Sequence, residues 1–276
     1  RDVRLNIDKE RAVAKETVLK VSHVNKANAL GKQVLKDVSF QIPRGVILGI
    51  AGVEGNGQSE ISEIISGMDR DFDGEVEVNG KSTRNMSVRE LRENGVAHIS
   101  EDRMTYGIVG DGSIAENIIS DRYYKKKFQK GLLLDQKKID HMVEELIDKF
   151  NVKCDGKDQP IRMLSGGNMQ KVVAAREFTN HADLIIANQP TRGIDIGASM
   201  FLRNKLVELR DAGASVLLIS ADLSEVMEVS DRLIVMCGGK ISAYFENAED
   251  ITEEEMGLYM LGLKQMTPEE IRRASN

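Results

Sequence analysis

Residues 47–59 read ILGIAGVEGNGQS, and this stretch decides the fold. An apolar strand leads into three glycines, Gly52, Gly55 and Gly57, and then into the amphipathic run 58–65. Glycines let the backbone wrap around an anion, and the helix that follows offers free N–H groups in its first turn. The stretch therefore predicts a phosphate-binding loop between a buried strand and a helix. On its own this signal is weak, because a tight turn without a ligand has the same pattern.

Strands and helices alternate along the rest of the chain. The apolar patterns predict strands at 18–24, 34–42, 46–51, 96–99, 184–187 and 215–220, and helices at 58–65, 87–94, 165–179, 198–212 and 223–229. The segment 113–150 is mostly helical in pattern, with a loop at 123–131. Asn79-Gly80 and Gly238-Gly239 predict the turns of two hairpins, the first in an antiparallel sheet beside the main one. The alternation predicts an α/β fold with a mainly parallel sheet, which binds ligands at the carboxyl ends of its strands.

The composition excludes several classes of protein. The 276 residues carry a formal net charge of −6, which argues against a general nucleic-acid binder. No stretch approaches about eighteen consecutive apolar residues, and no signal-peptide pattern occurs at the start. Cys154 and Cys237 lie far apart without metal-ligand spacing, and the histidines show none either. We therefore expect an intracellular protein whose cysteines are reduced packing residues.

Two further motifs follow the glycine loop. Residues 164–168, LSGGN, open a predicted helix with Ser165 as its N-cap, and the apolar strand at 184–187 ends in Asn188-Gln189-Pro190. The three motifs in this order, with the flanks LSGGNMQK and QPTRGIDIGA, resemble the nucleotide-binding domain of ABC transporters over about residues 17–250. The resemblance implies a P-loop NTPase core, an antiparallel β subdomain and a helical signature subdomain at about 104–175. Residues 1–16 would be a linker, and 251–276 a helical tail.

The motifs GVEGNGQSE, ISEDR, LSGGNMQK and QPTRGIDIGA are similar to the second half of the tandem ATPases of sugar and nucleoside importers. Gln189 with Ala187 is most similar to the nucleoside branch, and Arg1-Asp2-Val3 fits the tail of a first half. The resemblance implies a C-terminal half, paired with an N-terminal ABC half of the same polypeptide or with a second ABC domain. Its other partners would be transmembrane permease subunits at the cytoplasmic face of the plasma membrane and, indirectly, an extracellular solute-binding protein. The solute cannot be named from this sequence, and no nucleic acid is expected.

The resemblance also assigns the residues of the nucleotide site. ATP would lie on the loop residues Gly52, Glu54, Gly55, Asn56, Gly57, Gln58, Ser59 and Glu60, with Ser59 as a ligand of Mg²⁺. The signature residues Leu164, Ser165, Gly166, Gly167 and Asn168 would face the γ-phosphate of ATP bound to the partner half. Asp195 would line the interface of the pair or cap the helix that starts near residue 197. Glu101 stands in place of the family's Q-loop glutamine, and Asp102-Arg103 either touch the permease or form an ion pair at a helix start.

Several site positions depart from the family's pattern. Gln58 replaces the lysine that neutralises the β- and γ-phosphates, and Asn188 replaces the aspartate that supports the metal. Gln189 replaces the glutamate that acts as general base, and Ala221 replaces the switch histidine. No aromatic residue precedes Phe40 to stack on adenine. Since loss of a general base costs about 10² to 10⁴ in rate, no catalytic residue is assigned, and ATP and Mg²⁺ would bind weakly or not at all in this half.

Three functions stay open at this point. The first is an energy-coupling half of an importer, which lends its signature to a partner's site while its own site is deficient in hydrolysis. The second is a fully active ATPase that uses Glu101 or another carboxylate as base. The third, an ABC protein acting on nucleic acid, is disfavoured by the acidic charge and by the lack of a long arm or coiled-coil insertion. The basic run Lys125-Lys126-Lys127 is typical of a solvated surface, and contact with a partner or with lipid headgroups is the alternative.

Overall fold

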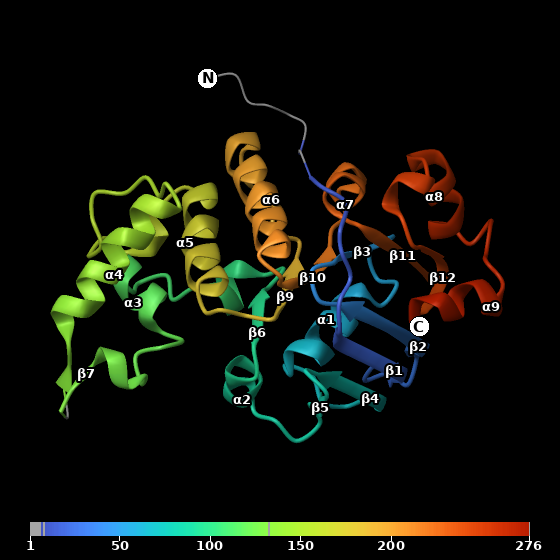
Figure 1. The fold of residues 1–276 in the computed structure, drawn as a ribbon, viewed down its shortest axis with the longest axis horizontal. Coiled ribbons are helices and arrows are strands. Elements are labelled where there is room, and N and C mark those ends of the chain that lie inside the picture. The colour runs from blue at the N-terminus through green and yellow to red at the C-terminus, as the bar shows by residue number, and fades with distance from the viewer. Residues whose placement is uncertain (1–6, 8, 132, 276) are drawn as a thin grey trace. The chain divides into compact units, whose positions relative to one another are not determined.

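The computed structural model describes residues 7, 9–131 and 133–275, and the chain divides into two compact units (Figure 1). The first unit extends to His98 and includes His181–Gln189 and the chain from Arg203 onward. The second unit comprises Ile99–Asn180 and Pro190–Leu202. Arg1-Asp2-Val3, which suggested a C-terminal half, lies outside the described residues.

The first unit holds a six-stranded sheet of order β12-β11-β3-β10-β9-β6. Its strands are β3 (Ile47–Gly52), β6 (Val96–Ile99), β9 (Leu184–Asn188), β10 (Ser215–Ile219), β11 (Arg232–Cys237) and β12 (Lys240–Phe245). Strands β11, β3, β10 and β9 pair in parallel, and β12 pairs antiparallel with β11. Every residue of β3, β9 and β10 is buried, as expected of parallel strands covered on both faces. The predicted mainly parallel sheet is confirmed.

An antiparallel sheet of order β2-β1-β4-β5 lies in the same unit. Its strands are β1 (Thr17–Ala27), β2 (Gln33–Pro43), β4 (Asp73–Val78) and β5 (Lys81–Ser82). Asn79 and Gly80 have φ values of 52° and 70°, as a two-residue hairpin turn with positive φ at both positions requires. The predicted hairpin beside the main sheet is confirmed.

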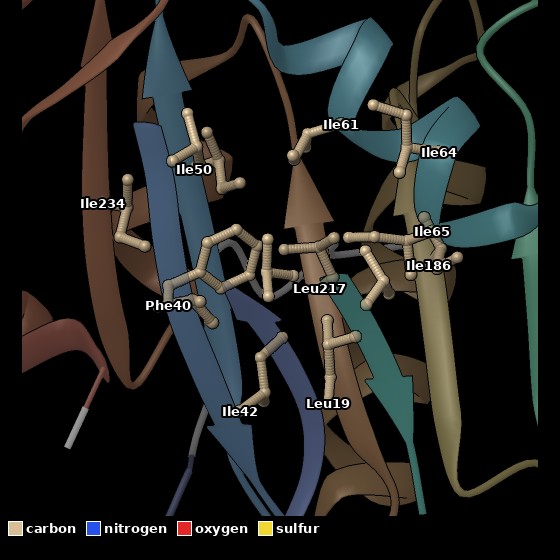
Figure 2. Packing of buried hydrophobic residues seen from close by; sticks show 14 of the residues in the cluster. Leu19, Phe40, Ile42, Ile50, Ile61, Ile64, Ile65, Ile186, Leu217 and Ile234 are labelled. Atoms are coloured by element: carbon tan, nitrogen blue, oxygen red, sulfur yellow. The ribbon is translucent and has the colours of Figure 1, made fainter. Parts of the chain in front are cut away.

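Helices cover both faces of the central sheet in the first unit. Helix α1 (Gln58–Ser66) shares one apolar cluster with Ile50 of β3, whereas α7 (Leu223–Val229) and α8 (Glu253–Met260) share another with the next residue, Ala51. Because successive residues of a strand point to opposite faces, α1 lies across the sheet from α7 and α8. Figure 2 shows the α1 cluster, in which Phe40 of β2 and Leu217 of β10 pack beside the isoleucines of the helix.

Residues 9–16, expected to be a linker, are bound along the first unit. The Lys9 ammonium donates to the Ser230 carbonyl, and Arg210 Nη1 donates to the Glu10 carbonyl at 2.9 Å. The Arg44 backbone exchanges hydrogen bonds with Lys15 and Glu16 at 3.2 and 2.8 Å. Beyond β12, the short helix α9 (Pro268–Ile271) contacts that strand. The domain boundaries drawn from the sequence stay a prediction.

The second unit is mainly helical. It contains α3 (Ile114–Ile119), α4 (Gln136–Lys149), α5 (Gly166–Phe178) and the start of α6 (Ile196–Asp211). Phe150 packs against Phe178 and Phe201 with ring centroids 6.5 and 5.9 Å apart. Between α3 and α4 the chain forms a small hairpin, β7 (Gln129–Lys130) and β8 (Leu133–Leu134). The predicted loop at 123–131 therefore ends in strands that are too short to show an alternating pattern.

We expect Phe40→Ala to destabilise the chain by about 3–5 kcal/mol, because it removes a fully buried aromatic side chain and leaves a cavity. Phe40 is 1% exposed, whereas Leu30 in the β1–β2 loop is 92% exposed. Leu30→Ala is the matched control and should change the stability by no more than about 0.5 kcal/mol. Urea unfolding followed by circular dichroism measures both variants. Equal midpoints for the two variants would contradict the assignment of Phe40 to the core.

Candidate nucleotide site

The carboxyl ends of the parallel strands lie level with one another in the first unit. Ile219 of β10 pairs with Ile50 on one side and with Asn188 on the other, and Met236 of β11 pairs with Gly52. The glycine loop and Asn188 therefore leave the sheet at the same edge. This is where the sequence predicted a ligand site, and this is the position at which open α/β sheets bind their ligands.

Gly57 is held where no side chain fits. A Cβ atom at this position would lie 2.6 Å from Leu35 Cδ2 and 3.0 Å from both the Val34 carbonyl oxygen and Met236 Cε. Its φ of 105° is also one that favours glycine. Gly57 is the N-cap of α1 and has no side chain that could accept a hydrogen bond from the first turn. The first turn of the helix therefore faces the loop without a capping side chain at the N-cap position. This is the shape of a phosphate cradle.

The Gln58 side chain folds back into the loop. Its Oε1 accepts a hydrogen bond from the Asn56 backbone N–H at 3.1 Å, and its Nε2 donates to the Val53 carbonyl at 3.1 Å. Gln58 is 8% exposed. The Asn56 side chain adds bonds of 2.8 Å to the Val53 carbonyl and 2.6 Å from the Gly238 N–H. The loop is thus closed by its own amide groups, and one of its N–H donors is already bonded.

The charged residues of the loop are all acidic. Residues 52–60, GVEGNGQSE, contain two glutamates, Glu54 and Glu60, and neither lysine nor arginine. The loop therefore has the shape of an anion site without a side-chain cation of its own.

Asn188 ends β9 in a buried position, with 4% of its surface exposed. Its Oδ1 has no hydrogen-bond partner within the described part of the chain. A buried acceptor left unpaired costs about 1–3 kcal/mol, so this oxygen suits a water molecule, including one bound to Mg²⁺. Ser59, the predicted Mg²⁺ ligand, lies in the first turn of α1. The described residues contain no cluster of three or more histidine, cysteine or acidic side chains that could hold a metal alone.

Gln189 and Ala221 contact each other. The Gln189 Oε1 accepts from the Ala221 backbone N–H at 3.1 Å, and the Gln189 N–H donates to the Ile219 carbonyl at 2.7 Å. Gln189 has a positive φ of 52°. Its amide oxygen is therefore turned toward the segment after β10. After Ala221, burial raises the pKa of Asp222, but hydrogen bonds from Ser224 and Glu225 and the nearby Arg203 outweigh this and lower it.

The signature residues form the start of α5 in the second unit. Ser165 is the N-cap, as predicted, and its Oγ accepts from Asn168 Nδ2 at 2.9 Å. A Cβ atom on Gly167 would lie 2.7 Å from Asp195 Oδ2 and 2.9 Å from Ala198 Cβ. Gly167 therefore lets the signature pack directly on the residues that begin α6.

Asp195 caps α6. Its Oδ1 accepts from the Ala198 N–H at 3.0 Å, which confirms the helix-capping alternative. The helix predicted at 198–212 accordingly begins two residues earlier, at Ile196. A role of Asp195 at a pair interface stays a prediction.

Glu101 is ion-paired with Arg192 in the second unit. The neighbouring Asp102 caps a helical turn at Arg103–Gly107, and hydrogen bonds from Thr105 and Met104 lower the pKa of its carboxyl group. Arg103 Nη1 donates to the Arg192 carbonyl at 2.7 Å. Asp102 therefore lies at a helix start, whereas Arg103 bonds a backbone carbonyl and not Asp102; contact of this pair with a permease stays a prediction.

Two buried polar side chains of α5 were not singled out in the sequence. Gln170 Nε2 donates to the Pro190 carbonyl at 2.8 Å, and Lys171 Nζ donates to the Asn151 carbonyl at 3.0 Å. Burial lowers the pKa of Lys171, and the nearby Asp195 opposes that shift. A polar residue inside a helix gives no sign in the sequence of which backbone carbonyl it meets.

Comparisons with known proteins show what the whole chain is similar to. The sequence model described as ABC transporter matches residues 35–192. The chain is 39% identical over 265 residues to the guanosine import ATP-binding protein NupO of Bacillus subtilis (strain 168), covering 96% of this chain and 52% of that protein. It is 37% identical over 262 residues to the nucleoside import ATP-binding protein NupA of Lactococcus lactis subsp. cremoris (strain MG1363), covering 95% and 52%. The chain thus spans about half the length of these relatives.

Solved structures share the fold at lower identity. The ATP-binding cassette MJ1267 in its ADP conformation superposes with a TM-score of 0.68 at 22% identity, covering 94% of this chain and 98% of that one. The ATP-binding cassette MJ0796 in a dimeric post-hydrolysis state superposes with a TM-score of 0.71 at 22% identity, covering 82% and 97%. No helix in the described residues is long and apolar enough to cross a membrane. The glycine loop, the signature and a family match over more than half of the residues together make this chain a member of the ABC transporter family.

Proposed function

We propose that this chain is the C-terminal ABC half of a sugar or nucleoside importer, which lends its signature to ATP bound on a partner ABC domain and does not hydrolyse ATP in its own loop. The names of its relatives, which include guanosine, glucose and nucleoside import proteins, support the importer class. The lack of hydrolysis in this chain's own loop is inferred from the position of Gln58, whose side-chain amide lies inside the loop.

The loop's own residues support the proposed deficiency. Replacing a charge-assisted contact to phosphate by a neutral one costs about 1–2 kcal/mol, or roughly tenfold in affinity. Before a nucleotide can use the Asn56 N–H, the Gln58 oxygen must also leave it. Gln189 cannot accept a proton from water, and its oxygen already accepts from Ala221. Mg²⁺ would neutralise part of the phosphate charge. Ser59 would hold it directly, and Asn188 would hold it through a water molecule.

The signature does not depend on such charges. The thirteen-residue helix α5 presents its amino end and its first N–H groups, which attract an anion through the helix dipole. Ser165 fixes where the helix begins, and the close contact of Gly167 with Asp195 fixes the position of its first turn. A γ-phosphate held by a partner domain would meet preorganised donors here.

An exposed apolar surface fits the predicted permease partner. Met104 and Tyr106 in the turn capped by Asp102, and Val109 just after it, are 56%, 62% and 67% exposed. Adjacent exposed apolar side chains mark protein contacts. A permease at the cytoplasmic face of the membrane would place this chain there as a peripheral subunit, and a solute-binding protein would act through that permease.

The two other functions have less support. A fully active ATPase with Glu101 as base would require a carboxylate that this structure pairs with Arg192. An ABC protein acting on nucleic acid would have to bind a polyanion with a chain of net charge −6.

We expect the triple variant Gln58→Lys, Asn188→Asp and Gln189→Glu to bind ATP at least about tenfold more tightly than the unmodified chain, because it restores the cation and the metal support. Titration with a fluorescent ATP analogue and Mg²⁺ measures this affinity. The single variant Gln58→Ala is the control, since it opens the loop without adding charge. Tight binding and steady turnover by the unmodified chain alone, comparable to a consensus ABC domain, would disprove the proposed deficiency.

We expect Ser165→Arg to lower ATP turnover by the chain mixed with its partner half at least about a hundredfold, because a bulky cation blocks donors that act on the partner's phosphate. Ser113→Arg is the matched control, since Ser113 is also an N-cap in the second unit and its loss costs about 1 kcal/mol of stability. Phosphate release assays compare the two mixtures. If both variants lower turnover equally, the signature acts only through folding.

A further inference from the structure

The segment between α3 and α4 is strongly basic in an acidic protein. Residues 123–138, YYKKKFQKGLLLDQKK, contain six lysines and a single carboxylate, Asp135, whereas the whole chain has a formal net charge of −6. We call this segment the lysine hairpin, because it contains the paired strands β7 and β8. Figure 1 shows it at one end of the second unit, beyond α3 and α4.

Exposed leucines lie beside these lysines. Leu133 and Leu134 of β8 are 75% and 46% exposed, and Tyr123 at the start of the segment is 49% exposed. Leu133 pairs with Lys130 across the two strands. Lys126, Lys127 and Lys130 are exposed as well. The hairpin therefore presents apolar and cationic groups together.

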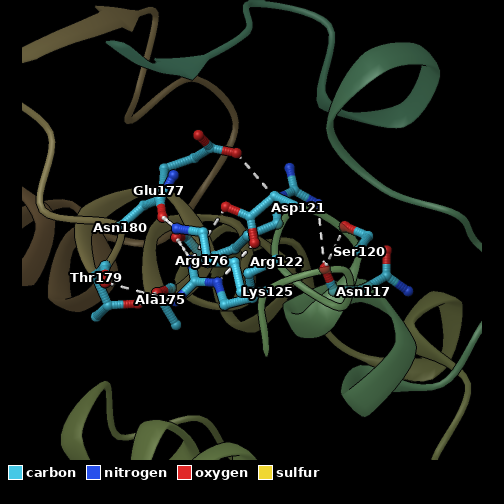
Figure 3. A network of polar contacts seen from close by, with 10 residues as sticks. All are labelled: Asn117, Ser120, Asp121, Arg122, Lys125, Ala175, Arg176, Glu177, Thr179 and Asn180. Atoms are coloured by element: carbon cyan, nitrogen blue, oxygen red, sulfur yellow. Dashed lines mark hydrogen bonds and ion pairs between the residues drawn. The ribbon is translucent and has the colours of Figure 1, made fainter. Parts of the chain in front are cut away.

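The base of the hairpin is anchored, so its exposed groups are held in a defined position. Lys125 Nζ donates to Asn180 Oδ1 at 2.7 Å, and Arg122 Nη1 donates to Thr179 Oγ1 at 2.9 Å (Figure 3). Phe128 is buried, with 4% of its surface exposed. These contacts tie the segment to the end of α5.

Asp135, the single carboxylate of the segment, does not neutralise Lys130, the exposed lysine of β7. Asp135 caps α4 by accepting from the Lys138 N–H, and its other oxygen lies 3.4 Å from Lys138 Nζ. Its charge is therefore used at the start of α4, and the 126–130 part of the segment keeps a local positive charge.

We propose that the lysine hairpin binds the surface of a lipid bilayer through anionic headgroups, with its strands inserting end-on so that Leu133 and Leu134, on opposite faces of β8, and Tyr123 enter the interface. A solvated surface explains lysines but not two adjacent exposed leucines. An interface with anionic lipid satisfies both, because apolar side chains enter the boundary of the acyl region while long lysine side chains reach the phosphates. The inference rests on the surface of the second unit alone and does not depend on the proposed nucleotide chemistry.

The charge of the chain distinguishes binding through the lysine hairpin from non-specific adsorption to the bilayer. A chain of net charge −6 is repelled as a whole by an anionic bilayer, so binding requires a local basic surface. A lysine near such a bilayer contributes about fivefold to the partition coefficient. Removal of three lysines or of two leucines should therefore change the partition coefficient by a measurable amount.

The test is co-sedimentation of the purified chain with vesicles of phosphatidylcholine alone and with vesicles of equal parts phosphatidylcholine and phosphatidylglycerol. We expect binding to the anionic vesicles only, reduced at high salt. The variant Lys126→Gln, Lys127→Gln and Lys130→Gln should lower the partition coefficient at least about tenfold. Leu133→Ser with Leu134→Ser should also lower it, with the salt dependence kept, because the lysines remain.

The matched control is Lys20→Gln, Lys32→Gln and Lys81→Gln, three exposed lysines of the first unit whose loss changes the net charge equally. It should bind the anionic vesicles as the unmodified chain does. Three results would overturn the proposal: no vesicle binding, equal loss in both triple variants, or binding to soluble inositol hexakisphosphate without binding to vesicles. Circular dichroism of each variant checks that it is folded.

Discussion

The close approach of three segments at Gly57 is the constraint on which the nucleotide site depends. The loop backbone there contacts Leu35 and the Val34 carbonyl of β2 and Met236 of β11 so tightly that a Cβ atom has no room. The contact ties the antiparallel sheet, the central sheet and the start of α1 together at one point. Since these contacts come from backbone and apolar atoms, they hold Gly57 in place whichever residue stands at position 58, and the Gln58 amide adds its own hydrogen bonds inside the loop.

Shape and charge are therefore separable in this site. Gln58 keeps the length and hydrogen-bonding capacity needed to span the loop, and it bonds both the Asn56 N–H and the Val53 carbonyl. A lysine could donate to the carbonyl but could not accept from the N–H. The amide thus stabilises this conformation of the loop in a way that a cation cannot, while it lacks the charge that would favour a phosphate over its own oxygen.

The sequence predicted those features that repeat or sit next to one another in the chain. Continuous apolar runs identified the buried strands β3, β9 and β10, and Ser165 before Gly166 identified the start of α5. Contacts between distant residues could not be predicted this way: Gly167 with Asp195, Gln189 with Ala221 and the buried bond of Gln170 to Pro190 all depend on the tertiary fold. The hairpin of β7 and β8 was missed because two-residue strands show no periodicity.

The difference between the loop and the signature follows from the kind of group each one uses. In the proposed function the loop would need a side-chain cation and a base, which Gln58 and Gln189 do not supply. The signature uses backbone N–H groups at the start of α5, which every residue except proline carries. What it needs from its sequence is a helix cap at Ser165 and a small residue at 167, where Asp195 and Ala198 leave no space. Under the proposed function, loss of chemistry in the loop would therefore not by itself impair the signature.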